Sequence, residues 1–140
     1  MSPGSPARST NVTRCLPAPG ICPNSATTSG TKLQIWQANG GKNQQWNFSS
    51  VGTNQWNLAV NLGPYCLDDG NAGQGTQTLL WSCNGGNNQK WHAADGNGGT
   101  NFYNYGDGLC LDVSGAGTAN GTPVVTYTCN GTNAQAWLVR

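Results

Sequence analysis

A short pattern, glutamine followed two positions later by tryptophan, occurs three times in this chain at nearly constant spacing. The copies are Gln44-Gln45-Trp46, Gln89-Lys90-Trp91 and Gln135-Ala136-Trp137, and their tryptophans lie 45 and 46 residues apart. A fixed period of this length is typical of an architecture built from repeated supersecondary units. We therefore expect three equivalent repeats of about 45 residues each.

Further positions recur in register with each tryptophan. An aromatic residue stands ten positions before it (Trp36, Trp81, Tyr127), Asn-Gly stands seven and six positions before it (Asn39-Gly40, Asn84-Gly85, Asn130-Gly131), and a Gly-Thr pair opens the runs GTKLQIW, GTQTLLW and GTPVVTY. These runs predict strands because apolar and β-favouring residues dominate them. Asn-Gly tolerates positive φ, so each run is expected to end in a tight turn.

The composition favours an all-β fold with a threefold arrangement. Gly, Asn, Gln, Ser and Thr occupy many positions where charged helix formers usually stand, so long amphipathic helices have little to be built from. A repeat of about four short strands cannot bury a hydrophobic face alone and must pack on its siblings. The three tryptophans of the repeated pattern are expected to form much of the shared core.

Six cysteines in a chain of 140 residues favour an oxidising compartment, and we expect a secreted protein. The second and third repeats carry YCLDDG and LCLDVSG, which predict the pairs Cys66 with Cys83 and Cys110 with Cys129, each worth roughly 3 kcal/mol through loop entropy. Cys15 and Cys22 are left to pair locally. The chain contains no Cys-x-x-Cys, and His92 is its only histidine, so no metal site is expected.

The first repeat departs from the pattern of the other two. Its best match is GICPN, which puts Cys22 at the position of Cys66 and Asn24 at the position of Asp68. Ala38 stands at the position that Cys83 holds in the second repeat. We therefore expect the first repeat to lack both the usual bridge and the aspartate.

The charge of the chain argues against several classes of partner. Charged residues make up 8% of the sequence and the formal net charge is +1, so no electrostatic footprint for nucleic acid or anionic lipid is present. No apolar run approaches the roughly 18 residues of a membrane helix, and the first eight residues lack the apolar stretch of a secretory signal. We expect a monomer that binds a neutral partner, does not insert into membranes and needs no cofactor.

CLD, an aromatic residue two positions before the second cysteine, and three copies of Gln-x-Trp together resemble the ricin-type β-trefoil. That family includes R-type lectins and the family 13 carbohydrate-binding modules attached to secreted glycoside hydrolases. The resemblance covers about residues 12–140, with repeats at about 12–50, 51–95 and 96–140, and residues 1–11 are expected to form a flexible, linker-like N-terminus. It implies a six-stranded barrel capped by three hairpins, with one shallow sugar pocket per repeat.

The resemblance also implies which residues bind the sugar in the second repeat. Asp68 would accept hydrogen bonds from two hydroxyls, Trp81 would stack on the sugar ring, and Asn84, Asn88 and Gln89 would complete the polar side. These residue types suit a pyranose, because its C–H face can lie on an aromatic ring while its hydroxyls bond to carboxylates and amides. A bond to a charged group contributes about 1.5 to 3 kcal/mol, so the aspartate is expected to set the orientation.

The other two repeats carry less complete sets. The third repeat offers Asp112, Tyr127, Asn130 and Gln135, but Ala134 replaces the amide of Asn88, so weaker binding is expected there. The first repeat offers Trp36, Asn43 and Gln44 without an aspartate. Two roles stay open for Gln44, Gln89 and Gln135, namely contact with the ligand and support of the core.

The sequence predicts a non-catalytic module that binds a galactose-type sugar or a xylan or arabinose-bearing polysaccharide, as part of a secreted glycoside hydrolase. A stand-alone R-type lectin is the first alternative, and a β-trefoil inhibitor or protein-interaction domain is the second. Catalysis is not expected, because the chain contains no glutamate and Asp69, Asp95 and Asp107 show no paired carboxylate partner in the sequence. His92 has no triad context.

Overall fold

The computed structural model describes residues 14–15, 20–23, 28–37, 41–96 and 98–139, with the backbone alone for 14–15 and 20–23. Its strands are β1 (Arg14–Cys15), β2 (Gly20–Pro23), β3 (Leu33–Trp36), β4 (Trp46–Gly52), β5 (Gln55–Val60), β6 (Tyr65–Asp68), β7 (Leu79–Ser82), β8 (Trp91–Asp95), β9 (Thr100–Asn104), β10 (Cys110–Val113), β11 (Val124–Tyr127) and β12 (Trp137–Leu138). Four short 3-10 helices are η1 (Lys42–Gln44), η2 (Asn87–Gln89), η3 (Ser114–Ala116) and η4 (Asn133–Gln135). Every helix within the described ranges is of this short type, so the all-β prediction is confirmed.

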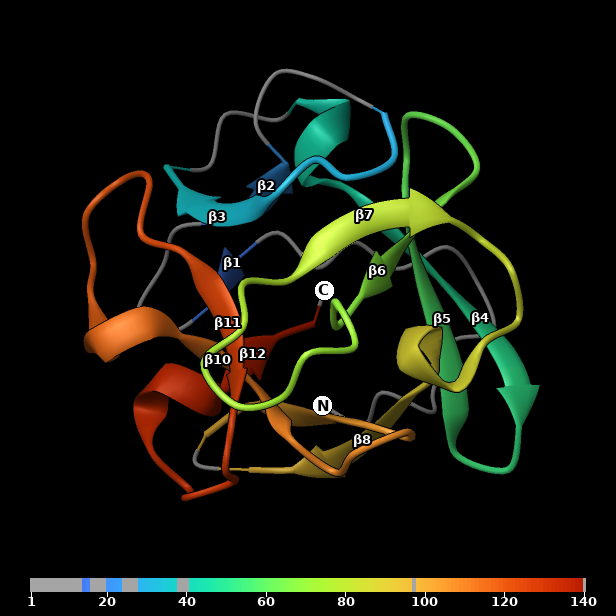
Figure 1. The fold of residues 1–140 in the computed structure, drawn as a ribbon. Helices are drawn as coiled ribbons and strands as arrows, with labels where there is room; N and C mark the ends of the chain where they lie inside the picture. The colour runs from blue at the N-terminus through green and yellow to red at the C-terminus, as the bar shows by residue number, and fades with distance from the viewer. Residues whose placement is uncertain (1–13, 16–19, 24–27, 38–40, 97, 140) are drawn as a thin grey trace.

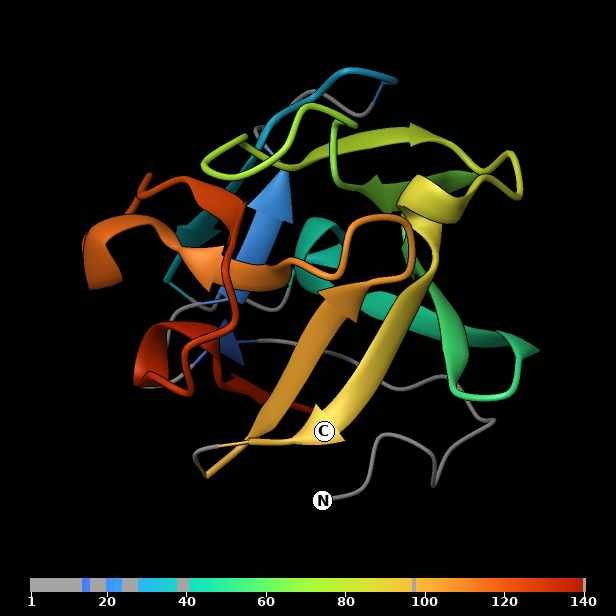
Figure 2. The same cartoon turned by 60° about the horizontal axis from the view of Figure 1, so that its bottom comes forward.

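Ten of the described strands form one curved sheet, and β2 pairs with β3 in a separate two-stranded sheet. Strands β4, β5, β8, β9, β12 and β1 pair antiparallel in that order. The hairpins β2-β3, β6-β7 and β10-β11 lie around the centre of the molecule (Figure 1, and turned in Figure 2). The repeat spacing predicts this threefold arrangement, and the family resemblance implies its identity as a β-trefoil.

The three repeated tryptophans fill the centre of the core, as predicted. Trp46, Trp91 and Trp137 are fully buried. The indole Nε1 of Trp91 donates to the carbonyl of Leu67 at 3.0 Å, and that of Trp137 donates to the carbonyl of Leu111 at 3.0 Å. The rings of Trp91 and Trp137 therefore bury their apolar surface without leaving the N–H unpaired.

The antiparallel register of the hairpins sends alternate side chains to opposite faces. In the second repeat, Cys66 stands opposite Trp81 and Asp68 opposite Leu79, while Leu67 and Leu80 are buried in the core. Cys110, Asp112, Val125 and Tyr127 occupy the same places in the third repeat. Because side chains alternate along a strand, the aspartate and the aromatic residue of each hairpin share its outer face.

The first hairpin corrects the alignment expected from the sequence. Gly20 stands opposite Trp36, and Cys22 stands opposite Gln34. Cys22 therefore takes the register position of Asp68, and the expected match of Asn24 to Asp68 is wrong by two residues. The hairpin loops differ in length between repeats, so spacing counted from a cysteine could not give the register.

Disulfides link Cys66 to Cys83 and Cys110 to Cys129, which are the two bridges predicted within repeats. The expected pairing of Cys15 with Cys22 concerns side chains outside the described part of the structure. The expected turn at Asn39-Gly40 also lies outside the described residues. Both remain predictions.

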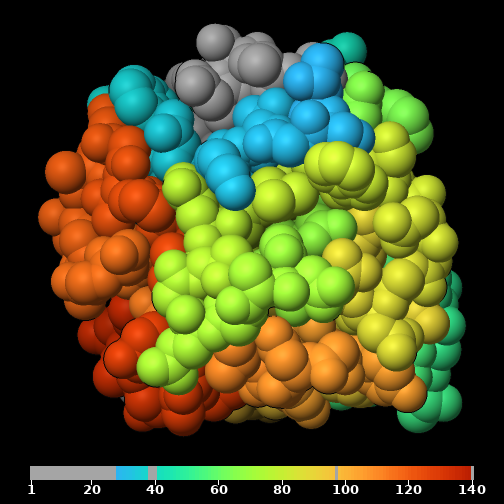
Figure 3. Space-filling view, in the orientation of Figure 1, coloured from blue at the N-terminus to red at the C-terminus, as the bar shows by residue number. Residues whose placement is uncertain are grey.

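The Gly-Thr pairs join each repeat to the next one. The bonds are Gly30 N–H to Leu80 O (2.7 Å) with Leu80 N–H to Thr31 O (2.8 Å), Gly75 N–H to Thr126 O (2.7 Å) with Thr126 N–H to Thr76 O (3.1 Å), and Gly121 N–H to Ile35 O (2.9 Å) with Ile35 N–H to Thr122 O (2.9 Å). The three glycines have φ of 95°, 82° and 88°, a region that disfavours side chains. Backbone hydrogen bonds therefore connect all three repeats to one another. Figure 3 shows the green loop of the second repeat at the centre of the face that it presents.

Candidate functional site

The second repeat forms a pocket of about 230 Å³ on the outer face of its hairpin. Its lining residues are Asp68, Gly70, Asn71, Leu79, Trp81, Asn84 and Asn88. Four of the five residues expected to bind sugar in this repeat therefore lie together, and the fifth, Gln89, lies beneath them. Trp81 is 46% exposed although it is a large apolar side chain, so its ring is open to solvent beside the pocket.

Asp68 is held in place by a set of hydrogen bonds although it is only 4% exposed. Its Oδ1 accepts from the N–H of Gly70 at 2.8 Å and from Asn88 Nδ2 at 3.0 Å. Its Oδ2 accepts from Asn88 Nδ2 and from Gln89 Nε2, both at 3.0 Å. Bonds to an ionised carboxylate are strong, so the group is fixed before any ligand arrives.

The glutamine of the repeated pattern supports the site from below. Gln89 is fully buried, its Nε2 also donates to the carbonyl of Ser82 at 3.0 Å, and its Oε1 accepts from the N–H of Asn84 at 2.9 Å. Gln135 repeats this set through Asp112 Oδ2 (2.7 Å), Thr128 O (2.9 Å) and Asn130 N–H (2.9 Å), and Gln44 donates to Gln37 O (2.9 Å). Of the two roles left open by the sequence, the structure favours support for all three glutamines, because they lie inside the protein.

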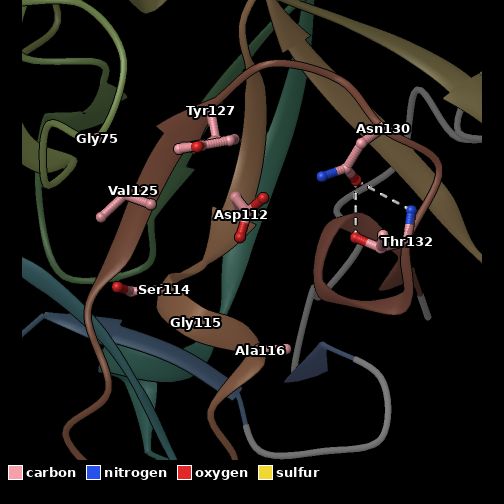
Figure 4. A pocket seen from close by; sticks show the side chains of 9 residues that line it. All are labelled: Gly75, Asp112, Ser114, Gly115, Ala116, Val125, Tyr127, Asn130 and Thr132. Carbon is pink, nitrogen blue, oxygen red and sulfur yellow. Dashed lines mark hydrogen bonds between the residues drawn. The ribbon is translucent and has the colours of Figure 1, made fainter.

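The third repeat forms a larger pocket of about 440 Å³. Figure 4 shows Asp112 in the middle of it, with Tyr127 on one side and Asn130 and Thr132 on the other. Tyr127 is 43% exposed, and Asn130 Oδ1 accepts from the Oγ1 of Thr132 at 2.7 Å. Three of the four residues expected here, Asp112, Tyr127 and Asn130, therefore line one cavity, and the fourth, Gln135, is buried.

Several lining residues of this pocket were not predicted. Ser114, Gly115 and Ala116 come from η3, and Gly75 comes from the hairpin loop of the second repeat. Gly75 reaches the pocket because its N–H is bonded to Thr126 in the strand that carries Tyr127. The recurring Gly-Thr pair was the one sequence feature that could have indicated this contact. Its partner is a backbone carbonyl of the next repeat, and any residue type can provide a backbone carbonyl.

Asp112 is supported less fully than Asp68. Gln135 donates to it, but Ala134 stands in place of Asn88 and provides no amide. Burial raises the pKa of Asp112 above its ordinary value, and the bond from Gln135 partly opposes that rise. The removal of one donor leaves a carboxylate that is easier for a ligand to reach and less firmly oriented.

The first repeat presents an aromatic residue without a carboxylate. Trp36 is 40% exposed, Asn43 is half-buried and Gln44 is buried. The register position of Asp68 is held here by Cys22, a residue type that carries no carboxylate. The expectation of a site without an aspartate therefore stands, with a different residue at that position.

The sequence profile of the ricin-type beta-trefoil lectin domain matches residues 8–137. The chain belongs to this family. No curated protein sequence matches it. The expected membership, argued from Gln-x-Trp and CLD, is confirmed.

Solved structures similar to this ricin-type domain share its whole fold. A designed threefold symmetric protein, ThreeFoil, has a TM-score of 0.85 at 28% identity over 94% of this chain and 96% of its own. A ricin B-like lectin from Macrolepiota procera, solved with lactose, has a TM-score of 0.78 at 23% identity over 99% and 98%. An exo-β-1,3-galactanase from Clostridium thermocellum has a TM-score of 0.84 at 21% identity over 96% of this chain and only 30% of its own.

The sequence shows no carboxylate partner for glycoside hydrolysis at Asp69, and in the ricin-type domain this residue lies near enough to Asp107 for their charges to interact. Asp69 is buried. Desolvation by burial raises the pKa of Asp69 to about 6, the bond from the N–H of Asn71 opposes that rise, and the nearby charges of Asp107 and Asp68 add to it.

Two further findings concern the described residues of the domain. They contain no group of three or more His, Cys, Asp or Glu side chains placed to hold a metal ion. Within those same ranges, no helix has the length and apolar character needed to cross a membrane.

Proposed function

We propose that this ricin-type domain binds neutral saccharides without catalysis, through the pockets of its second and third repeats. One observation carries the proposal. Asp68 and the half-exposed Trp81 lie on the same face of one hairpin and line one pocket with Asn84 and Asn88. A flat ring next to a fixed carboxylate suits the two chemical faces of a pyranose.

Asn88 has a particular part in this proposal. Its Nδ2 contacts both oxygens of Asp68, so it occupies positions on the carboxylate that a sugar hydroxyl would use. Because Asn88 is only half-buried, its amide can turn from the aspartate toward the ligand. Gln89 and the N–H of Gly70 then keep the carboxylate in position.

The third pocket is proposed as a second and weaker site. Asp112 and Tyr127 offer the same chemistry, but no amide stands at Ala134. A single millimolar site provides about 4 kcal/mol, so linked binding of two pockets to one polymer would raise the avidity by about 10² to 10⁴.

We propose galactose-containing glycans as the first ligands to test and xylan or arabinose-bearing chains as the second. The Macrolepiota procera lectin was solved with lactose, and the Clostridium thermocellum enzyme is a galactanase of which this chain covers 30%. That partial coverage and the two disulfides support a secreted module of a glycoside hydrolase. A stand-alone R-type lectin is the alternative.

The experiment is retention on immobilised galactose and on insoluble xylan. Wild-type protein should be retained on at least one matrix, and a variant that combines Asp68→Ala with Asp112→Ala should pass through. The control is Asp95→Ala, which removes an exposed carboxylate that lines neither pocket. Wild-type protein that passes through every glycan matrix would favour the inhibitor or protein-interaction alternative.

A further inference from the structure

Three aromatic rings line up on the outer wall of the sheet, outside the sugar pockets. We call Tyr103, His92 and Tyr105 the ring strip. The centroid of the His92 ring lies 4.8 Å from that of Tyr103 and 5.2 Å from that of Tyr105, and Tyr105 is 43% exposed. Lys90 Nζ lies 5.8 Å from the centroid of Tyr105.

The threefold symmetry offers an internal comparison for these rings. Trp91 stands opposite Asn104 as Trp46 stands opposite Val60, so the register equates His92 with Asn47 and Tyr103 with Ala59. The N–H of Tyr105 donates to Lys90 O at 2.8 Å, as that of Asn61 donates to Gln45 O at 2.8 Å, so Tyr105 corresponds to Asn61.

The pair β4 and β5, with the residue that follows β5, therefore carries two asparagines and an alanine where β8 and β9, with the residue that follows β9, carry three rings. The fold itself does not require aromatic side chains at these positions. Tyr105 is exposed and His92 and Tyr103 are half-buried, and exposed aromatic surface that folding does not require is typical of a binding surface.

The ring strip begins where the second-repeat pocket ends. Asn88, which lines the pocket, accepts at its carbonyl a bond of 3.0 Å from Asn104 Nδ2. A Cβ placed on Gly106 would lie 3.7 Å from the carbonyl of Asn87, so the loop after β9 packs directly on η2. Figure 2 shows η2, the start of β8 and this loop side by side.

We propose that the ring strip holds further sugar units of a neutral polysaccharide whose first unit occupies the second-repeat pocket. The inference rests on the proposed function and extends it from single sugars to chains. Tyrosine rings present flat apolar faces to the C–H groups of sugars, and the ammonium group of Lys90 donates hydrogen bonds to their hydroxyls. His92 Nδ1 lies 2.6 Å from the carbonyl of Asn54, which fixes the orientation of the middle ring.

The test replaces the strip with the corresponding residues of the β4-β5 pair, in a variant that combines His92→Asn, Tyr103→Ala and Tyr105→Asn. Titration calorimetry with galactose and a ladder of galacto-oligosaccharides, and in parallel with xylose and xylo-oligosaccharides, gives the affinity as a function of chain length. Wild-type affinity should rise with length. The variant should bind the monosaccharide as wild type does and lose about tenfold or more on the longest chains.

Two controls keep the outcome clear. Tyr105→Asn alone should lose part of the gain with length, in case the triple variant does not fold. Leu62→Asn removes an exposed apolar side chain outside the strip and should change nothing. A variant that keeps the wild-type dependence on chain length overturns the inference while the proposed function survives; wild-type protein that binds neither ladder overturns the proposed function itself.

Discussion

The side-chain amide of Gln89 donates to the carboxylate of Asp68 and to the carbonyl of Ser82, at 3.0 Å in each case. One buried group therefore joins the end of β7 to the acid of the candidate site. Two positions later, the same short segment places Trp91 in the core. In the second and third repeats the pattern thus positions both the core tryptophan and the acid of the candidate site.

Asp68→Ala is expected to reduce glycan binding more than Asp112→Ala. Loss of a bond to a charged group costs about 1.5 to 3 kcal/mol, or roughly tenfold or more at the second pocket. Calorimetry on each single variant measures the effect, and unchanged thermal unfolding shows that the fold is intact. Binding equal to wild type in both variants would remove Asp68 and Asp112 from the site.

Gln89→Ala is expected to lower both stability and affinity. The change leaves the carbonyl of Ser82 and the N–H of Asn84 without their partner, at a cost of about 1 to 3 kcal/mol, and it frees Asp68 to move. Gln44→Ala is the matched control, because Gln44 is also buried but belongs to the repeat without an aspartate. The control should lose similar stability in urea and retain its binding; a parallel loss of binding would show that the effect at Gln89 is not local.

The two tryptophans Trp91 and Trp81 are expected to behave in opposite ways. Trp91→Ala removes a fully buried ring and should lower the free energy of unfolding by about 3 to 5 kcal/mol, enough to unfold many domains. Trp81→Ala removes a half-exposed ring and should leave the denaturation midpoint nearly unchanged while binding is lost. Chemical denaturation followed by circular dichroism separates the two, and a Trp81→Ala variant that binds as wild type does would exclude the stacking role.

Stability is expected to fall as the pH rises through 6, because of Asp69. Its pKa in the folded protein is raised to about 6, mainly by burial, whereas the unfolded chain keeps the ordinary value of about 3.9. The folded state therefore holds the proton more tightly, so this contribution is complete below about pH 4 and is lost above about pH 6, at most about 3 kcal/mol. Asp69→Asn should reduce the pH dependence of the urea midpoint.

The exposed Asp95 provides the control for the pH experiment, and Asp95→Asn should keep the wild-type profile. Part of the slope should remain in Asp69→Asn, because the pKa of Asp112 is raised as well. An unchanged profile in Asp69→Asn would show that the pair with Asp107 does not hold a proton in solution.

The sequence alone was sufficient to predict the repeat, the all-β fold, the core tryptophans, two disulfides and the grouping of Asp68 with Trp81. Each of these depends on periodicity or on spacing within one hairpin, and both are visible in one dimension. The buried role of Gln89 stayed open at that stage, because a polar side chain near a turn can face either way.

Only the tertiary structure decided what depends on contacts between repeats and on loop length. The register of the first hairpin put Cys22 opposite Gln34, and the Gly75 loop reached the pocket of another repeat. Asp69 of the second repeat lies near Asp107 of the third repeat. The physical reason is the same in all three cases. A loop can close in several ways, and packing against the neighbouring repeat selects one of them.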